Sequence, residues 1–203
     1  DVLTNLKLEI AELVEAGEIA TATQRTAELN GWLQSSGQFA KDGITTIAFH
    51  LLEQGASLAK SGNITDAITS YQQALAVDPT ITVTAEIEVN RHYAPTILKQ
   101  AAELARSGEI SKAIASYQQA LTLDPTLIIT PDAEAKRQYA PTIVKQASEL
   151  AVQGEITKAV ASYQQALVFD PTLRITPELE AKRQYAPIIL REAEKLALRG
   201  EIT

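Results

Sequence analysis

The sequence contains no cysteine and no methionine, and only 5% of its 203 residues are aromatic. Without cysteine the chain cannot form disulfides, a thiolate zinc site or a cysteine nucleophile. The absence of cysteine also fits a reducing compartment, so we predict a cytoplasmic location. No apolar run reaches the ~18 residues that a membrane-spanning helix needs.

Positive charge is also scarce, with 18 Lys and Arg against 25 Asp and Glu and a net charge of −7. An acidic chain without a basic cluster is a poor candidate for binding nucleic acid or an anionic membrane. Alanine is abundant among the apolar residues, and small apolar residues suit closely packed helices better than sheets. We therefore predict an all-α protein whose partners are neither nucleic acid nor membrane.

The sequence does contain a strong internal repeat. The hexapeptide Ser-Tyr-Gln-Gln-Ala-Leu occurs three times, and its tyrosines Tyr71, Tyr117 and Tyr163 are 46 residues apart. A second motif of glycine, a polar residue and isoleucine begins at Gly17, Gly62, Gly108, Gly154 and Gly200. A fixed period of this size indicates an array of one supersecondary unit.

The period divides the chain into one array with five parts. These are a degenerate N-terminal repeat (1–37), three repeats (38–79, 80–125 and 126–171) and a partial repeat (172–203). Degenerate end repeats are typical of the caps of a solenoid. Because the period is already running at residue 1 and still running at residue 203, we expect a fragment of a longer protein.

The repeat that begins near residue 126 predicts a connector and two helices. Residues 126–130 are β-branched and extended, but helix pairs hold neighbouring repeats too far apart for a strand ladder. Thr130-Pro131 is typical of a helix start, and Gly154 of a C′ position that ends this first helix. The second helix, about 157–168, has Tyr163 on its buried face.

A proline interrupts the first helix of three repeats, at Pro95, Pro141 and Pro187. It removes a backbone donor and clashes with the preceding turn, so it either kinks the helix or splits it in two. We favour a kink, because Ala140 would be a poor N-cap for a separate helix.

These features resemble the tetratricopeptide repeat, a helix-turn-helix of about 34 residues. The matching positions are Gly55, Leu58, Gly62, Ala67, Tyr71, Ala74 and Pro79; then Ala101, Leu104, Gly108, Ala113, Tyr117, Ala120 and Pro125; then Ala147, Leu150, Gly154, Ala159, Tyr163, Ala166 and Pro171. The unit here is about 12 residues longer than that of the family. Such long units are similar to those of large multidomain signalling proteins of filamentous bacteria, especially cyanobacteria.

The resemblance implies a right-handed α-solenoid of stacked antiparallel helix pairs that acts as a non-catalytic protein-interaction scaffold. It places a groove for a partner's peptide or helix on the concave face, along the first helix of each pair. The predicted groove residues are Leu52, Ala56, Ala59, Leu98, Ala102, Ala105, Val144, Ser148, Ala151, Leu190, Glu194 and Ala197. This small, apolar row suits an amphipathic helix or an extended apolar segment. Alternatively, the array's own next superhelical turn or other parts of the parent chain cover it.

The motif Arg-x-Tyr-Ala-Pro offers a second candidate surface. Its residues are Arg91, Tyr93, Arg137, Tyr139, Arg183 and Tyr185. Together they would form a ladder that binds an acidic or aromatic partner. Alternatively, the tyrosines fill gaps between long helices while the arginines pair with Glu88, Glu134 and Glu180.

Signals for catalysis, metals and cofactors are weak. His50 has no partner at ligand spacing, and His92 occupies a position that holds glutamine in other repeats. The Ser-x-x-Lys match at Ser57 is not repeated in the other units. We therefore predict no enzyme activity, metal or cofactor. The alternative function is self-assembly, in which arrays stack head to tail into oligomers or filaments.

Overall fold

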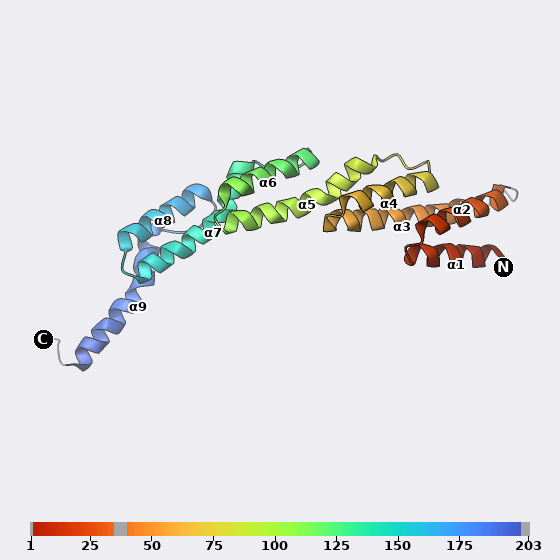
Figure 1. Cartoon of the computed structure of the whole chain (residues 1–203). Helices are drawn as coiled ribbons and strands as arrows, with labels where there is room; N and C mark the ends of the chain where they lie inside the picture. The colour runs from red at the N-terminus through yellow and green to blue at the C-terminus, as the bar shows by residue number, and fades with distance from the viewer. Residues whose placement is uncertain (1, 35–39, 200–203) are drawn as a thin grey trace. The chain divides into compact units, whose positions relative to one another are not determined.

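The computed structural model describes residues 2–34 and 40–199. In this part of the chain the elements are α1 (Val2–Glu15), α2 (Ile19–Gln34), α3 (Ala40–Ser61), α4 (Ile64–Val77), α5 (Ala85–Arg106), α6 (Ile110–Leu123), α7 (Pro131–Val152), α8 (Ile156–Phe169) and α9 (Pro177–Leu198), as Figure 1 shows. No strand occurs among these residues, so the all-α prediction is confirmed. The predicted boundary between the first two repeats, at residues 37 and 38, lies outside them.

The chain forms two compact units, Asp1–Thr96 and Ile97–Thr203, and α5 contributes to both. In the first unit α3 packs along α4, while α1 packs against α2 and both contact α3. In the second unit α7 packs along α8 and also contacts α6 and α9. Adjacent helices therefore form antiparallel pairs, as in an α-solenoid.

A buried tyrosine lies at the centre of each complete helix pair. Tyr163 of α8 is 0% exposed, and its cluster contains four alanines, Ala147, Ala151, Ala159 and Ala181. Small side chains allow the helices to approach closely, so that one aromatic ring fills the space between them. Tyr71 and Tyr117 occupy the same position in their own pairs, so the threefold hexapeptide is a core motif, as predicted.

Glycine ends the first helix of each pair in a left-handed conformation. Gly154 has φ +83°, and the backbone N–H groups of Gly154 and Glu155 donate to the carbonyls of Ala151 and Leu150, both at 2.9 Å. These two bonds are those of a Schellman motif. The C′ position predicted for Gly154 is therefore confirmed, and Gly17, Gly62 and Gly108 also have positive φ.

Replacing Gly154 with alanine should lower the free energy of unfolding by about 1 kcal/mol, because a Cβ strains this conformation. The new Cβ would lie 3.4 Å from the Tyr185 ring, a contact that requires little movement. Urea unfolding followed by circular dichroism measures the loss. The control is Gln153→Ala, at a right-handed neighbour with φ −76°, and equal stability of the two variants would contradict the prediction.

The connectors between pairs are extended and held by a turn at each Asp-Pro-Thr. Asp124 Oδ1 accepts hydrogen bonds from the backbone N–H and the hydroxyl of Thr126, at 3.0 and 2.6 Å. Ile128 points into solvent, while its neighbour Ile129 packs against the Tyr117 cluster. The same turn recurs at Asp78 and Asp170. These segments are connectors rather than strands, as the sequence predicted.

The internal prolines do not split the long helices. Each of α5, α7 and α9 runs as one helix of 22 residues through its proline. In α7 the missing N–H of Pro141 leaves the Arg137 carbonyl without its donor within the helix. Of the two alternatives, the single long helix is therefore the observed one.

Candidate interaction surface

Three of the predicted groove residues lie in the core instead. Ala59, Ala105 and Ala151 are 0% exposed, so none of them can present its side chain to a partner. Ala105 packs with Tyr117 of its own pair and with Ala135 from the first turns of the next long helix. The residues that lengthen each repeat, the connector and these first turns, therefore cover part of the predicted groove.

The remaining groove positions are partly exposed or exposed. In the second unit Leu98 and Ala102 of α5 and Val144 and Ser148 of α7 are partly exposed, and we call these four residues the first-helix surface. Leu52 and Ala56 of α3 are partly exposed in the first unit. Leu190, Glu194 and Ala197 of α9 are exposed. Partner binding by these residues stays a prediction.

The first-helix surface contains one hydroxyl that contacts the core tyrosine. The Ser148 hydroxyl oxygen lies 2.8 Å from the hydroxyl oxygen of Tyr163. The equivalent residues of the two preceding repeats are Ala56 and Ala102. The sequence shows this alanine-to-serine difference, but only the structure shows its partner.

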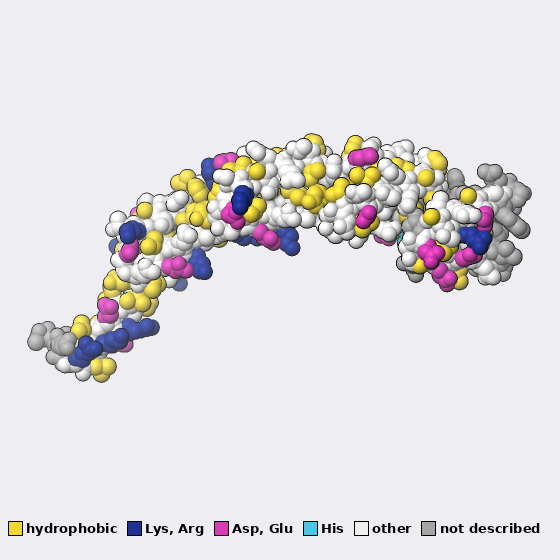
Figure 2. Space-filling model, in the orientation of Figure 1, with side chains coloured by type: hydrophobic (Ala, Val, Ile, Leu, Met, Phe, Trp, Pro, Cys, Tyr) yellow, Lys and Arg dark blue, Asp and Glu magenta, His cyan; other side chains and the backbone are white. Residues whose placement is uncertain are grey.

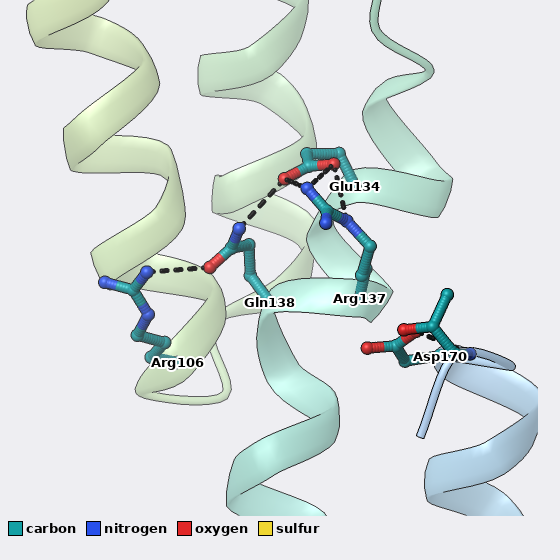
Figure 3. A network of polar contacts seen from close by, with 6 residues as sticks. Arg106, Glu134, Arg137, Gln138 and Asp170 are labelled. Atoms are coloured by element: carbon teal, nitrogen blue, oxygen red, sulfur yellow. Dashed lines mark hydrogen bonds and ion pairs between the residues drawn. The ribbon is translucent and has the colours of Figure 1, made fainter. Parts of the chain in front are cut away.

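A polar network connects α5 to the first turns of α7 (Figure 3). Arg106 donates to the Gln138 side-chain oxygen at 2.8 Å, and the Gln138 amide donates to Glu134 at 2.9 Å. Arg137 also donates to Glu134, at 2.7 Å from Nη2 and 3.0 Å from Nε. These bonds from Arg137 are the main reason why the pKa of Glu134 lies below its ordinary value.

The network also reaches the core tyrosine and the next connector. Burial raises the pKa of Tyr117, and the negative charge of Glu134 adds to the effect. Hydrogen bonds from Thr172 lower the pKa of Asp170, and Arg137 contributes a further attraction. Glu134 is thus a partly buried carboxylate that accepts hydrogen bonds from Arg137 and Gln138, which fits a structural role.

The arginines of Arg-x-Tyr-Ala-Pro pair within their own helices. Arg91 lies 2.8 Å from Glu88, Arg137 lies 2.7 Å from Glu134 and Arg183 lies 3.8 Å from Glu180. In the first unit His92 replaces the glutamine of the network and stacks on Tyr71, with 6.4 Å between ring centroids.

The tyrosines of the same motif cover the glycine turn of the preceding pair. A Cβ added to Gly62, Gly108 or Gly154 would lie 3.4–3.6 Å from the ring of Tyr93, Tyr139 or Tyr185, respectively. The geometry thus matches the packing alternative for this motif, with tyrosines in gaps and arginines paired with glutamates. The arginines of the motif are exposed, whereas its tyrosines are partly exposed.

Threonine after the internal proline forms a contact that sequence reasoning missed. The Thr96 hydroxyl donates to the Lys60 carbonyl and the Thr142 hydroxyl to the Arg106 carbonyl, both at 2.8 Å. Each bond satisfies a carbonyl at the end of the preceding long helix. The repeated Pro-Thr pair was the available signal, and Ile188 takes this place in α9.

An open hollow of about 420 Å³ lies on α5, apart from the predicted groove positions. It is lined by Gln100, Glu103, Leu104 and Ser107.

Among the described residues, no three His, Cys, Asp or Glu side chains are grouped so that they could hold a metal ion. In the same part of the chain, no helix combines the length and apolarity needed to cross a membrane.

Comparison with known protein families matches residues 96–127 to the tetratricopeptide repeat. The matched segment contains the second half of α5, all of α6 and the following Asp-Pro turn. No curated protein matches the chain. The match supports the resemblance of one helix pair to this family and does not extend to the 46-residue unit.

Proposed function

We propose that this chain is a non-catalytic scaffold that binds a helix or peptide of a partner protein on the first-helix surface. The tetratricopeptide match at residues 96–127 supports a role in protein–protein interaction. The observation that carries the proposal is the first-helix surface itself, a set of small, uncharged side chains that remains partly exposed beside a filled core.

The spacing of the first-helix surface suits a docked segment. Leu98 and Ala102, like Val144 and Ser148, are four residues apart, so each pair lies on one face of its helix. Leu98 also packs against the Tyr117 cluster and Val144 against the Tyr163 cluster, and these contacts hold both side chains in place. A partner's apolar side chains would bury these residues further without desolvating a charge.

Hydrogen bonds hold α5 and α7 in a fixed relation, which favours binding. The Thr142 hydroxyl and the Gln138 side chain both join α7 to Arg106 at the end of α5. A surface whose helices are already held in place loses less conformational entropy when a partner docks. The network therefore supports the proposal without contacting the partner itself.

We also propose a cytoplasmic location and a place in a larger signalling protein. The absence of cysteine supports the first of these. The long unit, which is similar to those of multidomain bacterial signalling proteins, supports the second.

A phage-displayed library of 16-residue peptides, selected on the immobilised chain, tests the binding proposal. Peptides that bind should lose about tenfold or more in affinity for the variant Ala102→Arg, because a desolvated charge replaces a methyl group. The matched control is Gln100→Arg, which adds the same charge at an exposed position of the same helix.

Two outcomes would contradict the proposal. The first is a library that yields no peptide with measurable affinity, and the second is a set of peptides that bind both variants equally. Sedimentation of the same samples over a concentration series tests the self-assembly alternative, which requires oligomers that grow with concentration.

A further inference from the structure

Three positions of α3 differ in chemistry from the same positions of the other long helices. In α3 they hold Phe49, His50 and Glu53. Their equivalents are Pro95, Thr96 and Lys99 in α5, Pro141, Thr142 and Lys145 in α7, and Pro187, Ile188 and Arg191 in α9. The other three helices therefore share a proline and a cation, where α3 has an aromatic ring and a carboxylate.

Phe49 presents its aromatic ring to solvent. It is 56% exposed, and the His50 ring lies edge-on to it with 6.3 Å between the ring centroids. Pro95 and Pro141 occupy this place in α5 and α7 and are also exposed, although further helix pairs follow both. The array itself therefore leaves this position of the long helix open, and a docked partner would remove the exposed ring from water.

Glu53 lies one turn beyond Phe49 on the same face of α3. Its side chain is 62% exposed and lies 4.0 Å from His50 Nδ1, a pair that attracts only when the imidazole is protonated. Within the part of the chain that the structure describes, no lysine or arginine pairs with Glu53. Its negative charge is therefore available to a ligand.

The net charge of the first unit favours a cationic ligand. Residues 1–96 contain 12 Asp and Glu against 5 Lys and Arg, whereas residues 97–203 contain 13 of each kind. On the face that Figure 2 shows, acidic side chains predominate over basic ones in the first unit. Such a field attracts a positively charged partner, and Glu53 then provides a specific contact.

We propose that Phe49 and Glu53 bind an arginine side chain of a partner protein, while Leu52 and Ala56 contact the apolar residues beside that arginine. Phe49 and Glu53 are four residues apart, so one guanidinium group can reach both. Leu52 and Ala56 are partly exposed and follow Phe49 by three and seven residues, which places them on the same face.

The pair of an aromatic ring and a carboxylate favours arginine over lysine. The planar guanidinium group stacks on an aromatic ring and pairs with a carboxylate through two parallel hydrogen bonds, which a lysine ammonium cannot do. This α3 site is separate from the first-helix surface, which lies on α5 and α7 and consists of uncharged residues. The two sites therefore select different segments.

A phage-displayed library of 16-residue peptides, selected on the immobilised full chain, provides the probes. Fluorescence anisotropy then measures each selected peptide against the variants Glu53→Lys and Ala102→Arg. We expect a class of peptides, all containing arginine, that Glu53→Lys weakens about tenfold or more and Ala102→Arg leaves unchanged. Phe49→Ala should weaken the same peptides about fivefold.

Two matched controls lie in the same unit. Glu12→Lys changes the charge of the first unit by the same amount at an exposed position of α1, and Ile87→Ala removes an exposed apolar side chain from α5. Both should leave the affinity within about twofold of that of the unchanged chain. Phe49 and Glu53 are exposed, so the far-ultraviolet circular dichroism of their variants should match that of the unchanged chain.

Replacing the arginine of a selected peptide tests the contact directly. Citrulline keeps the shape of arginine without its charge and should weaken binding to the unchanged chain about tenfold. The same replacement should matter less than about threefold for the Glu53→Gln chain, because the paired carboxylate is already gone. A peptide with glutamate in this place should bind Glu53→Lys more tightly than it binds the unchanged chain.

Three outcomes would overturn the proposal. The library yields no peptide that Glu53→Lys weakens, or the peptides of that class bind equally well with citrulline. In the third, the chain self-associates and Glu53→Lys makes it monomeric, which would identify the occupant as a second copy. Peptides that respond to Ala102→Arg alone would support the first-helix surface while overturning the α3 site, so the two proposals fail separately.

Discussion

Replacing Ala151 with arginine should cost more than about 3 kcal/mol and unfold the helices around it, because it buries an unpaired charge. Ala151 is 0% exposed and packs with Tyr163 and with Ala181 of the next long helix. Circular dichroism should show reduced helicity at 25 °C and a thermal unfolding transition at a lower temperature than that of the unchanged chain. Repeat arrays permit such partial unfolding.

The neighbouring residue provides the control for this experiment. Val152 is 44% exposed, so Val152→Arg adds the same charge in solvent and should change stability by no more than about 0.5 kcal/mol. If both variants melt alike, Ala151 is accessible in solution and returns to the groove candidates. If they differ as expected, the extended repeat covers this part of the groove.

Truncating Tyr163 to alanine should lower the free energy of unfolding by about 3–5 kcal/mol, as is typical for a large buried aromatic side chain. The ring is fully buried among alanines, which have no volume to spare for filling the resulting cavity. Urea denaturation of the full chain, followed by circular dichroism, measures the change.

Two further variants separate the causes of this loss. Tyr163→Phe keeps the ring but removes the hydroxyl that faces Ser148, and it should cost about 1 kcal/mol. Val168→Ala removes an apolar side chain from the same helix at a position that is 77% exposed, and it should be nearly neutral. A Tyr163→Ala variant as stable as Val168→Ala would contradict the tyrosine-centred core.

Most of the fold could be predicted from local chemistry in the sequence. Gly154 was expected to end a helix because only glycine adopts positive φ freely, and it does so with φ +83°. The Thr130-Pro131 start also agrees with α7, whose first residue is Pro131. For Pro141 the sequence leaves a kink and a split both open, because the outcome depends on whether neighbouring helices support the turn around the missing N–H.

The candidate site was predicted only in part. Leu98 and Ala102 are partly exposed, as a groove requires, but Ala105 on the same helix is buried. A helical period identifies which residues share a face and does not reveal what lies against that face. Here the cover is the connector and Ala135, which follows Ala105 by 30 residues in the sequence.

The sequence by itself determined the array, its period of 46 residues and the core role of Tyr71, Tyr117 and Tyr163. Those features depend on backbone preferences and on apolar spacing, which act over a few residues. Only the tertiary structure decided that Ala59, Ala105 and Ala151 are buried while Ala193 and Ala197 of α9 are exposed. The side chains are identical in size, and what differs is whether another helix packs on them, a contact between residues far apart in the chain.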